Sequence, residues 1–369
     1  MKKNIRTVAL IGKPRDPLAA EHIVRLAEFL RVRGLAVVLE QGTAALLRPD
    51  FAPTQPLDAI GKNVDLAVIV GGDGTLLNVA RHLAPHRVPL IGVNLGRLGF
   101  LADIRPDDMI DAIGRILDGD HQSESRLLLA AEIVRQGKIV HTASAFNDVI
   151  ITKGELARLI EFETYLDGEF VNSTRGDGAI VASPTGSTAY ALSAGGPILH
   201  PAMPALVLVP ICPHTLSNRP IVVSSDSVIK MVITGSPDQR AHVSFDGQSS
   251  FSLEDNDHVF VRRAAVTVEL VHPSSRRHFD VLREKWGIPL VAQEHIPGDG
   301  RGVLALCDSK ARLVGLVAMR KLAVTDKGKA WSGVTVKDEE MLEMARHVLR
   351  ELQWVGPAEL EFVRHSGSG

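Results

Sequence analysis

The sequence predicts an α/β domain, then a mainly antiparallel β domain, then a smaller α+β segment. Three observations lead to this order. Short apolar runs and helical patterns alternate up to about residue 125, residues 126–272 alternate apolar with polar positions instead, and a new set of strand and helix patterns follows residue 288. A chain of 369 residues that is 45% hydrophobic and 23% charged contains enough apolar material for two or three cores.

The first domain begins with a strand, a helix and a second strand. Residues 7–11 form a short apolar run, residues 21–33 have helical periodicity closed by Gly34, and residues 35–39 are again apolar. The same pattern predicts two further strands, at residues 66–70 and 89–93. Ligands of a small parallel sheet of this kind are expected beyond the carboxyl ends of its strands.

The second domain is predicted from alternation, as in residues 266–270, and from a hairpin signal at Asp167 and Gly168. Residues 279–286 form a short amphipathic stretch after it. We therefore expect a Rossmann-like nucleotide-binding domain at residues 1–125 together with about 273–287. A β-rich domain is expected at 126–272.

Composition excludes several classes of function. A net charge of -2 and a pI near 6.7 provide no general field for nucleic acid, and an aromatic content of 4% argues against stacking platforms. No apolar stretch approaches the roughly 18 residues of a membrane span. Cys212 and Cys307 form no metal or disulfide framework, and no early apolar run follows the basic start, so we expect a reduced, cytoplasmic location.

The first candidate site is the run Gly71-Gly72-Asp73-Gly74-Thr75, which directly follows a buried strand and precedes an apolar helical pattern. Glycines let backbone N–H groups approach phosphate oxygens, and a helix N-terminus favours anions. Asp73 fits a hydroxyl that is to be deprotonated, or a metal ion. The alternative is a tight turn with an aspartate helix cap, and the run lacks the Lys-Ser/Thr ending of a P-loop.

Three further clusters combine turn residues with hydrogen-bonding groups. Residues 94–101 hold Asn94, two glycines and the cation Arg97, which could meet phosphate; the alternative is a simple turn. Asn147 and Asp148 precede an apolar strand and could hold a ribose or a base, or form an Asx turn. Residues 172–201 are rich in glycine and hydroxyl groups but contain too many apolar anchors for a flexible linker, so they predict a closely held polar ligand.

The order of these motifs resembles that of bacterial NAD kinases of the Gram-negative type, over residues 1–287. The motifs are Gly71-Gly72-Asp73-Gly74, Asn94-Leu95-Gly96, Asn147-Asp148, Pro184-Thr185-Gly186-Ser187-Thr188-Ala189-Tyr190, Pro213-His214 with Leu216 and Arg219-Pro220, and Phe245-Asp246-Gly247-Gln248. Lipid, sphingoid-base and sugar kinases share only the first motif and form an alternative class. A non-catalytic nucleotide-binding scaffold is the other alternative.

The resemblance implies that NAD is phosphorylated to NADP, with ATP as donor and Mg²⁺ or another divalent cation as cofactor. It implies that Asp73 faces the adenosine 2′-hydroxyl of NAD as a base or orienting group. The β-rich domain would bind NAD, and the protein would be a homo-oligomer, a dimer or tetramer. The residues implied to contact the two nucleotides are Gly72, Gly74, Thr75, Asn94, Asn147, Asp148, Arg175, Asp177, Thr188, Ala189, Tyr190, Ser193 and Gln248. Of these, Arg175 would lie near the new 2′-phosphate and Asp177 would reach the nicotinamide part, often that of a neighbouring subunit.

Residues 288–365 lie beyond the usual end of such kinases and resemble the central part of an ATP-grasp domain. Residues 293–296, Gln-Glu-His-Ile, would match the adenine hinge, and Glu361 the first acidic metal position. The lysine-bearing subdomain and the second acidic segment of that fold are absent, so we expect no ligase activity, and we expect the segment to pack on a partner or to be poorly ordered. Residues 366–369, Ser-Gly-Ser-Gly, resemble an expression linker. A natural fusion, a gene-prediction artefact and an engineered chimera all remain open.

Overall fold

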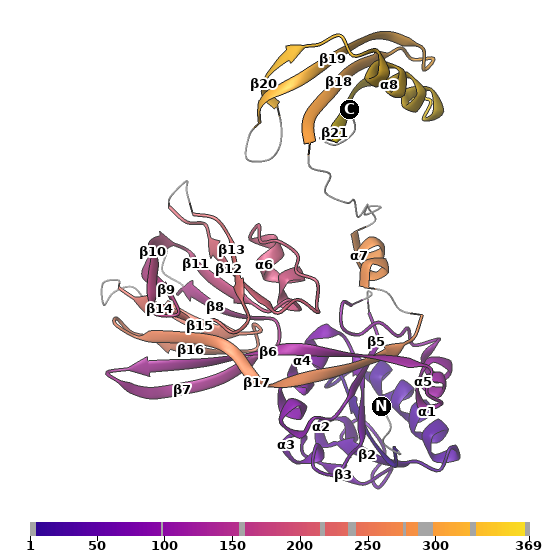
Figure 1. Ribbon diagram of the computed structural model, residues 1–369. Coiled ribbons are helices and arrows are strands. Elements are labelled where there is room, and N and C mark those ends of the chain that lie inside the picture. Colours follow the sequence, from indigo (N-terminus) through magenta and orange to yellow (C-terminus); the bar gives the residue numbers. More distant parts are fainter. Residues whose placement is uncertain are drawn as a thin grey trace. The chain divides into compact units, whose positions relative to one another are not determined.

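The computed structural model describes residues 5–96, 99–154, 159–214, 218–234, 241–275, 278–286, 298–324 and 330–365 (Figure 1). The chain divides into two compact units, Met1–Ile288 and Pro289–Gly369. The helices of the described part include none that is long and apolar enough to cross a membrane.

The first unit begins with the predicted parallel sheet. Its strands, in spatial order, are β5 (Leu90–Asn94), β4 (Leu66–Gly71), β1 (Thr7–Gly12), β2 (Ala36–Glu40) and β3 (Thr54–Gln55). The helices around it are α1 (Pro17–Val32), α2 (Gln41–Ala44), α3 (Leu57–Ile60), α4 (Asp73–Leu83), the 3₁₀ turn η1 (Ala84–His86) and α5 (Met109–Leu117). The helix predicted from residue 21 starts earlier, at Pro17, because the Asp16 side chain accepts the N–H of Leu18 and proline is tolerated at the first helical position.

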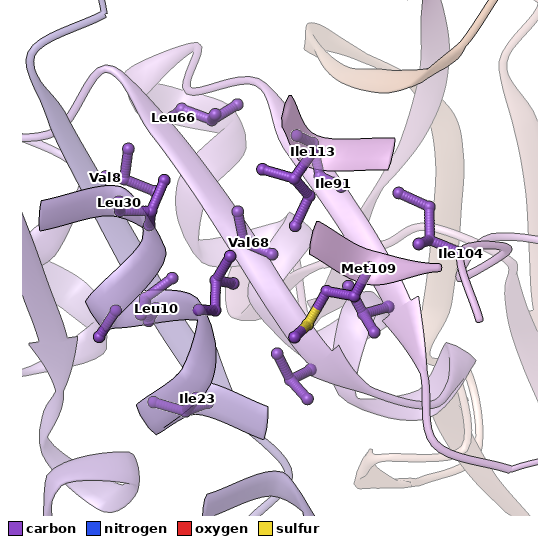
Figure 2. Close-up of a cluster of buried hydrophobic side chains, with 14 of the residues drawn as sticks. Val8, Leu10, Ile23, Leu30, Leu66, Val68, Ile91, Ile104, Met109 and Ile113 are labelled. Atoms are coloured by element: carbon purple, nitrogen blue, oxygen red, sulfur yellow. The ribbon is translucent and has the colours of Figure 1, made fainter. Parts of the chain in front are cut away.

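Each face of the parallel sheet buries its own apolar cluster. One cluster packs α1 and α5 against the sheet, with Val8, Ile23 and Met109 among its members (Figure 2). The other packs α4 against the opposite face through Leu76, Val79 and Leu83. The strands are apolar along both faces, as expected when helices cover both sides of a parallel sheet.

The second half of this unit is antiparallel, as the alternation predicted. Its strands are β6 (His121–Arg135), β7 (Lys138–Ala145), β8 (Asp148–Lys153), β9 (Ile160–Leu166), β10 (Glu169–Gly176), β11 (Gly178–Ala182), β12 (Ala205–Ile211), β13 (Ile221–Ser224), β14 (Ile229–Ile233), β15 (Ala241–Phe245), β16 (Ser249–Leu253) and β17 (His258–Pro273). Short helices η2 (Gly186–Thr188) and α6 (Tyr190–Ser193) follow β11, and α7 (His278–Trp286) follows β17. The predicted hairpin joins β9 to β10, with Asp167 and Gly168 both at positive φ.

The long strand β17 joins the two halves. It pairs antiparallel with β6 along its length, and its Leu270 pairs in parallel with Leu90 of β5 (Figure 1). The parallel strands and part of the antiparallel strands therefore belong to one sheet of eleven strands, while β13-β12-β11-β8-β15-β16 form a second sheet. The domain boundary expected at residue 125 falls inside β6 and remains a prediction.

The second unit is a four-stranded antiparallel sheet in the order β20 (Ala330–Thr335), β19 (Leu313–Val324), β18 (Gly298–Cys307) and β21 (Gly356–His365), with α8 (Glu339–Glu351) packed on it. Its core includes Val303, Ala318 and Met341. Strands and a helix are therefore present after residue 288, as the sequence patterns predicted. The expected hinge at residues 293–296 lies outside the described residues, and Glu361 occupies a position on β21 opposite Gly302.

Candidate active site

Asp73 is the first residue of α4 and directly follows β4 and Gly72. Its side chain does not cap the helix, contrary to the alternative reading of the glycine run. The carboxylate instead accepts backbone N–H groups of the loop after β5, from Phe100 at 2.8 Å, Leu101 at 3.2 Å and Ala102 at 3.0 Å. Three donors from one loop fix the position of this carboxylate.

Gly99 makes room for the Asp73 carboxylate. A Cβ atom added at Gly99 would lie 1.9 Å from Asp73 Oδ1 and 2.7 Å from its Cγ. Any side chain at this position would therefore displace the carboxylate. The glycine is required by close approach to Asp73.

Asp246, in the turn between β15 and β16, connects the two halves of the unit. Its side chain is fully buried, and Oδ1 accepts the backbone N–H groups of Phe146 at 3.0 Å, Asn147 at 2.7 Å and Asp148 at 3.2 Å. Oδ2 pairs with Arg81 of α4 at 2.8 Å. The carboxylate thus joins the helix that starts at Asp73 to the loop that carries Asn147 and Asp148.

Gln248 extends this connection to the glycine run. Its Oε1 accepts from Arg81 Nη2 at 2.6 Å, and its Nε2 donates to the carbonyl of Gly74 at 2.7 Å. Arg81, Asp246 and Gln248 form what we call the clasp. The clasp holds Gly74 and the backbone of Asn147 and Asp148 in one fixed arrangement.

Asp148 is nearly fully buried at the start of β8, with 4% of its surface exposed. Burial raises the pKa of its carboxyl from the usual value of 3.8 to about 7, and the nearby charge of Asp246 adds to the shift. Near neutral pH this group therefore exists as a mixture of the acid and the carboxylate. As the acid it can donate a hydrogen bond, which a carboxylate cannot.

The predicted glycine- and hydroxyl-rich stretch packs directly on Asn147. Ser183 N–H donates to the Asn147 carbonyl at 2.8 Å, and a Cβ added at Gly186 would lie 2.0 Å from the same oxygen. Thr188 and Ala189 are half-buried, whereas Tyr190 and Ser193 are exposed. This stretch is thus brought to the same place as Asp148.

Three other predicted residues are held by separate contacts. Asn94 is buried, and its Oδ1 accepts the N–H of Gly96 at 2.9 Å. Arg175 pairs with Glu161 at 3.4 Å, and Asp177 pairs with Lys153 at 2.6 Å. These two ion pairs involve no member of the clasp.

A cavity of about 350 Å³ lies beside the glycine run. Gly74 and Thr75 border it at the start of α4, and Gln248 of the clasp lines it as well. The rest of its lining includes Gly12, Pro14, Glu40, Gly42 and Asn78. A helix N-terminus at the wall of a cavity suits an anionic ligand.

Sequence reasoning gave no role to Arg81 or Asp246. Asp246 stood within a quoted motif, but Arg81 has no motif and occupies the last turn of an amphipathic helix, where arginine is common. No local signal indicates either contact. Arg97 and Leu216, which the sequence analysis singled out, lie outside the described residues.

Comparison with known families decides the assignment. Residues 8–121 match the ATP-NAD kinase N-terminal domain, and residues 146–273 match the ATP-NAD kinase C-terminal domain. The chain belongs to the NAD kinase family. The resemblance inferred from the motifs is confirmed.

Curated relatives of the family match the first unit almost end to end. The chain is 51% identical over 287 residues to the NAD kinase of Aromatoleum aromaticum, covering 77% of this chain and 95% of that one. It is 50% identical over 289 residues to the NAD kinase of Thiobacillus denitrificans, covering 78% of this chain and 99% of that one.

Solved structures agree with this assignment. Yeast NADH kinase complexed with NADH superimposes with a TM-score of 0.71 at 27% identity, covering 77% of this chain and 87% of that chain. An Archaeoglobus fulgidus NAD kinase in complex with ATP gives a TM-score of 0.61 at 26% identity, covering 77% of this chain and all of that chain. The mixed α/β, two-domain fold of the family is therefore present in this chain.

Replacement of Gly99 by alanine tests the Asp73 cradle, by which we mean the amides of residues 100–102 and the space left by Gly99. The added Cβ should push the carboxylate from the three amides and lower kcat about 10- to 100-fold, because small displacements of reacting groups are costly. The matched control is Gly96→Ala, whose Cβ would meet only Asn94 Oδ1 at 3.8 Å and should be tolerated. Equal kcat values for the two variants would contradict the cradle.

The raised pKa of Asp148 predicts a pH-dependent stability. The folded chain keeps this proton up to about pH 7, whereas the unfolded chain releases it near 4, so stability falls as pH rises through that window, by on the order of a few kcal/mol. Asp148→Asn should remove this loss, raising the melting temperature at pH 8 while leaving it nearly unchanged at pH 4. If the melting temperature of Asp148→Asn does not rise at pH 8, the pKa of Asp148 is not raised as described.

Proposed function

We propose that this protein transfers the γ-phosphoryl group of ATP to the adenosine 2′-hydroxyl of NAD, giving NADP and ADP. The observation that carries the proposal is the position of Asp73, at the start of α4 between the cavity-lining Gly74 and the amide loop at residues 100–102. When a hydroxyl attacks a phosphoryl group, a carboxylate that can accept the proton must lie next to the phosphate site, here a helix N-terminus.

We assign the cavity beside the glycine run to the donor. Gly72, Gly74 and Thr75 would border the ATP phosphates there, where the start of α4 offers backbone N–H groups to anions. Mg²⁺ in such sites is held largely by substrate phosphates and waters, so the ATP phosphates would supply most of its ligands here. When bound, the ion would neutralise charge on the transferring phosphate.

We assign NAD to the other side of the clasp. Asn147 and Asp148 would contact its adenosine and ribose, and the exposed Tyr190 with the half-buried Thr188 and Ala189 would line the adenosine pocket. Asn94 and Ser193 complete the proposed NAD contacts, and Gln248, which lines the cavity, is assigned to the nucleotide there. Arg175 is assigned to the new 2′-phosphate and Asp177 to the nicotinamide part of a neighbouring subunit, which makes a homo-oligomer part of the proposal.

In the proposed step Asp73 accepts the proton of the 2′-hydroxyl as its oxygen bonds to the γ-phosphorus. The bond between that phosphorus and the bridging oxygen breaks, and ADP departs. Oδ1 of Asp73 accepts the amides of Leu101 and Ala102 and Oδ2 accepts that of Phe100, so Oδ2 is the oxygen to be shared between one amide and the substrate hydroxyl. Each carboxylate oxygen can accept more than one hydrogen bond, which makes this sharing feasible.

We further propose that the first unit contains a Rossmann-like domain at residues 1–125 with about 273–287 and a β-rich NAD-binding domain at 126–272. The second unit would be an ATP-grasp-like piece without ligase activity. It lies beyond the residues matched by both family domains. Its β18 and β19 also expose Leu304, Leu306 and Val317, apolar side chains that a complete domain would normally cover.

NADP formation from NAD, ATP and Mg²⁺ tests the proposal. Full-length protein and a version ending at Lys285 should both produce NADP, whereas Asp73→Asn should lower kcat about 10²- to 10⁴-fold because it removes the base. The Asp73→Asn variant loses the acceptor for at least one of the three amides, so it should melt at a lower temperature than the parent but still fold and bind NAD.

Other outcomes distinguish the alternatives. Phosphorylation of sugars or lipids in place of NAD would support the kinases that share only the glycine run. Tight NAD binding without turnover by either length of chain would support a non-catalytic scaffold. Turnover by the shorter version alone would show that the second unit is inhibitory.

A further inference from the structure

The loop that holds Asp73 is itself anchored by buried charged side chains. Asp103 directly follows the three residues whose amides bind the Asp73 carboxylate, and only 7% of its side chain is exposed. Ala102 packs tightly on β5, where a Cβ added at Gly92 would lie 2.7 Å from the Ala102 Cα. The loop therefore has one apolar anchor at Ala102 and one polar anchor at Asp103.

His272, near the end of β17, is the partner of Asp103. Its side chain is 1% exposed, and its Nδ1 lies 3.2 Å from the Asp103 carboxylate. Two acceptors would not approach this closely, so Nδ1 carries a proton and donates it to the carboxylate. A hydrogen bond between two buried side chains on a strand and a loop leaves the loop little freedom to shift.

The contacts continue on the other side of the histidine ring. His272 Nε2 lies 3.9 Å from the carboxylate of Glu124 on β6, and that carboxylate is bonded by Arg126, whose Nε is 3.0 Å away. The Arg126 side chain is 4% exposed, and its Nη1 donates to the Thr185 hydroxyl at 3.4 Å. One series of side chains, buried except for the partly exposed Glu124, thus runs from the Asp73 loop to the stretch assigned to adenosine.

Stability alone does not account for such a series. Burying charged groups carries a large desolvation cost, and apolar replacements of similar volume are often as stable or more stable. The location offers a different explanation, because the rate of a phosphoryl transfer depends on the placement of the reacting groups to within about 1 Å.

We propose that Asp103 and His272 are positioning residues for Asp73. Their hydrogen bond fixes the loop at residues 100–102, so that its amides hold the Asp73 carboxylate where it meets the substrate hydroxyl. The inference rests on the proposed function of Asp73, and neither side chain touches the substrate itself.

The test compares kcat with KM for two pairs of variants. Asp103→Ala and His272→Ala remove the bond and should lower kcat about 10- to 100-fold while KM for NAD stays within about threefold. Asp103→Asn keeps an acceptor, and His272→Asn keeps a donor near the place of Nδ1, so both should recover kcat to within about threefold of the parent. Recovery by the conservative variants is a result that a purely packing role would not give.

A matched control uses a second buried aspartate, Asp257, whose partner is an arginine. Asp257 precedes β17, its side chain is fully buried and it pairs with Arg135 at 2.8 Å, at the opposite end of the strand from His272. Asp257→Ala should lower the melting temperature but leave kcat within about twofold, since it does not contact the Asp73 loop. NADP formation by the parent protein, measured alongside, separates failure of this inference from failure of the proposed function.

Other results would overturn the inference. Alanine variants whose kcat is unchanged, or changes no more than that of Asp257→Ala, would show that the pair contributes only to packing. If the alanine variants do not fold, His272→Gln is the test. Its amide lies near the position of Nε2, so it cannot replace the bond that Nδ1 makes to Asp103. A kcat below that of His272→Asn supports the positioning role, and equal values contradict it.

Discussion

The Asp246 carboxylate is fully buried, and four hydrogen-bonding groups compensate for its loss of hydration. Three are backbone N–H groups of residues 146–148, and Arg81 provides the charged partner. Breaking a buried pair by removing one member typically costs about 3–5 kcal/mol, because the other charge is left without compensation. The backbone of the Asn147 loop is therefore tied to α4, and with it to Asp73. A separate contact, from Arg81 to Gln248, extends the same constraint to Gly74.

The two halves of the proposed site come from different kinds of sheet, which explains why they need such a connection. Parallel strands place Asp73 at the carboxyl end of β4, and antiparallel strands place Asp148 at the start of β8. The two sheets differ in strand direction and covering helices, so backbone pairing alone does not align these ends. β17 joins the parallel strands to antiparallel strands within one sheet, and the clasp joins that sheet's helix α4 to the loop before β8 through side chains, where both substrates are proposed to meet.

Local chemistry explains what the sequence could predict. Apolar runs next to glycines gave β4 and α4, and alternation gave the antiparallel strands, because these patterns report nearest neighbours. The pairing of Arg81 with Asp246 was beyond such reasoning, since the two residues are 165 positions apart and neither has a distinguishing local pattern. The pairing of β17 with β5 and the contacts of Asp73 with the loop after β5 also join residues far apart in the sequence, so no local pattern predicts them. Gly99 could be read as a turn residue, but its reason is a carboxylate that arrives from another strand.

A double-mutant cycle on the clasp tests the central claim that one junction aligns both halves of the site. The kcat/KM for NADP formation is measured for the parent, Arg81→Met, Asp246→Asn and the double variant. If the two side chains act as a unit, each single change should cost about tenfold or more and the double variant should be within about threefold of the worse single variant. Losses that multiply in the double variant, or single variants that retain the parent kcat/KM, would show that the halves of the site are aligned by something other than the clasp.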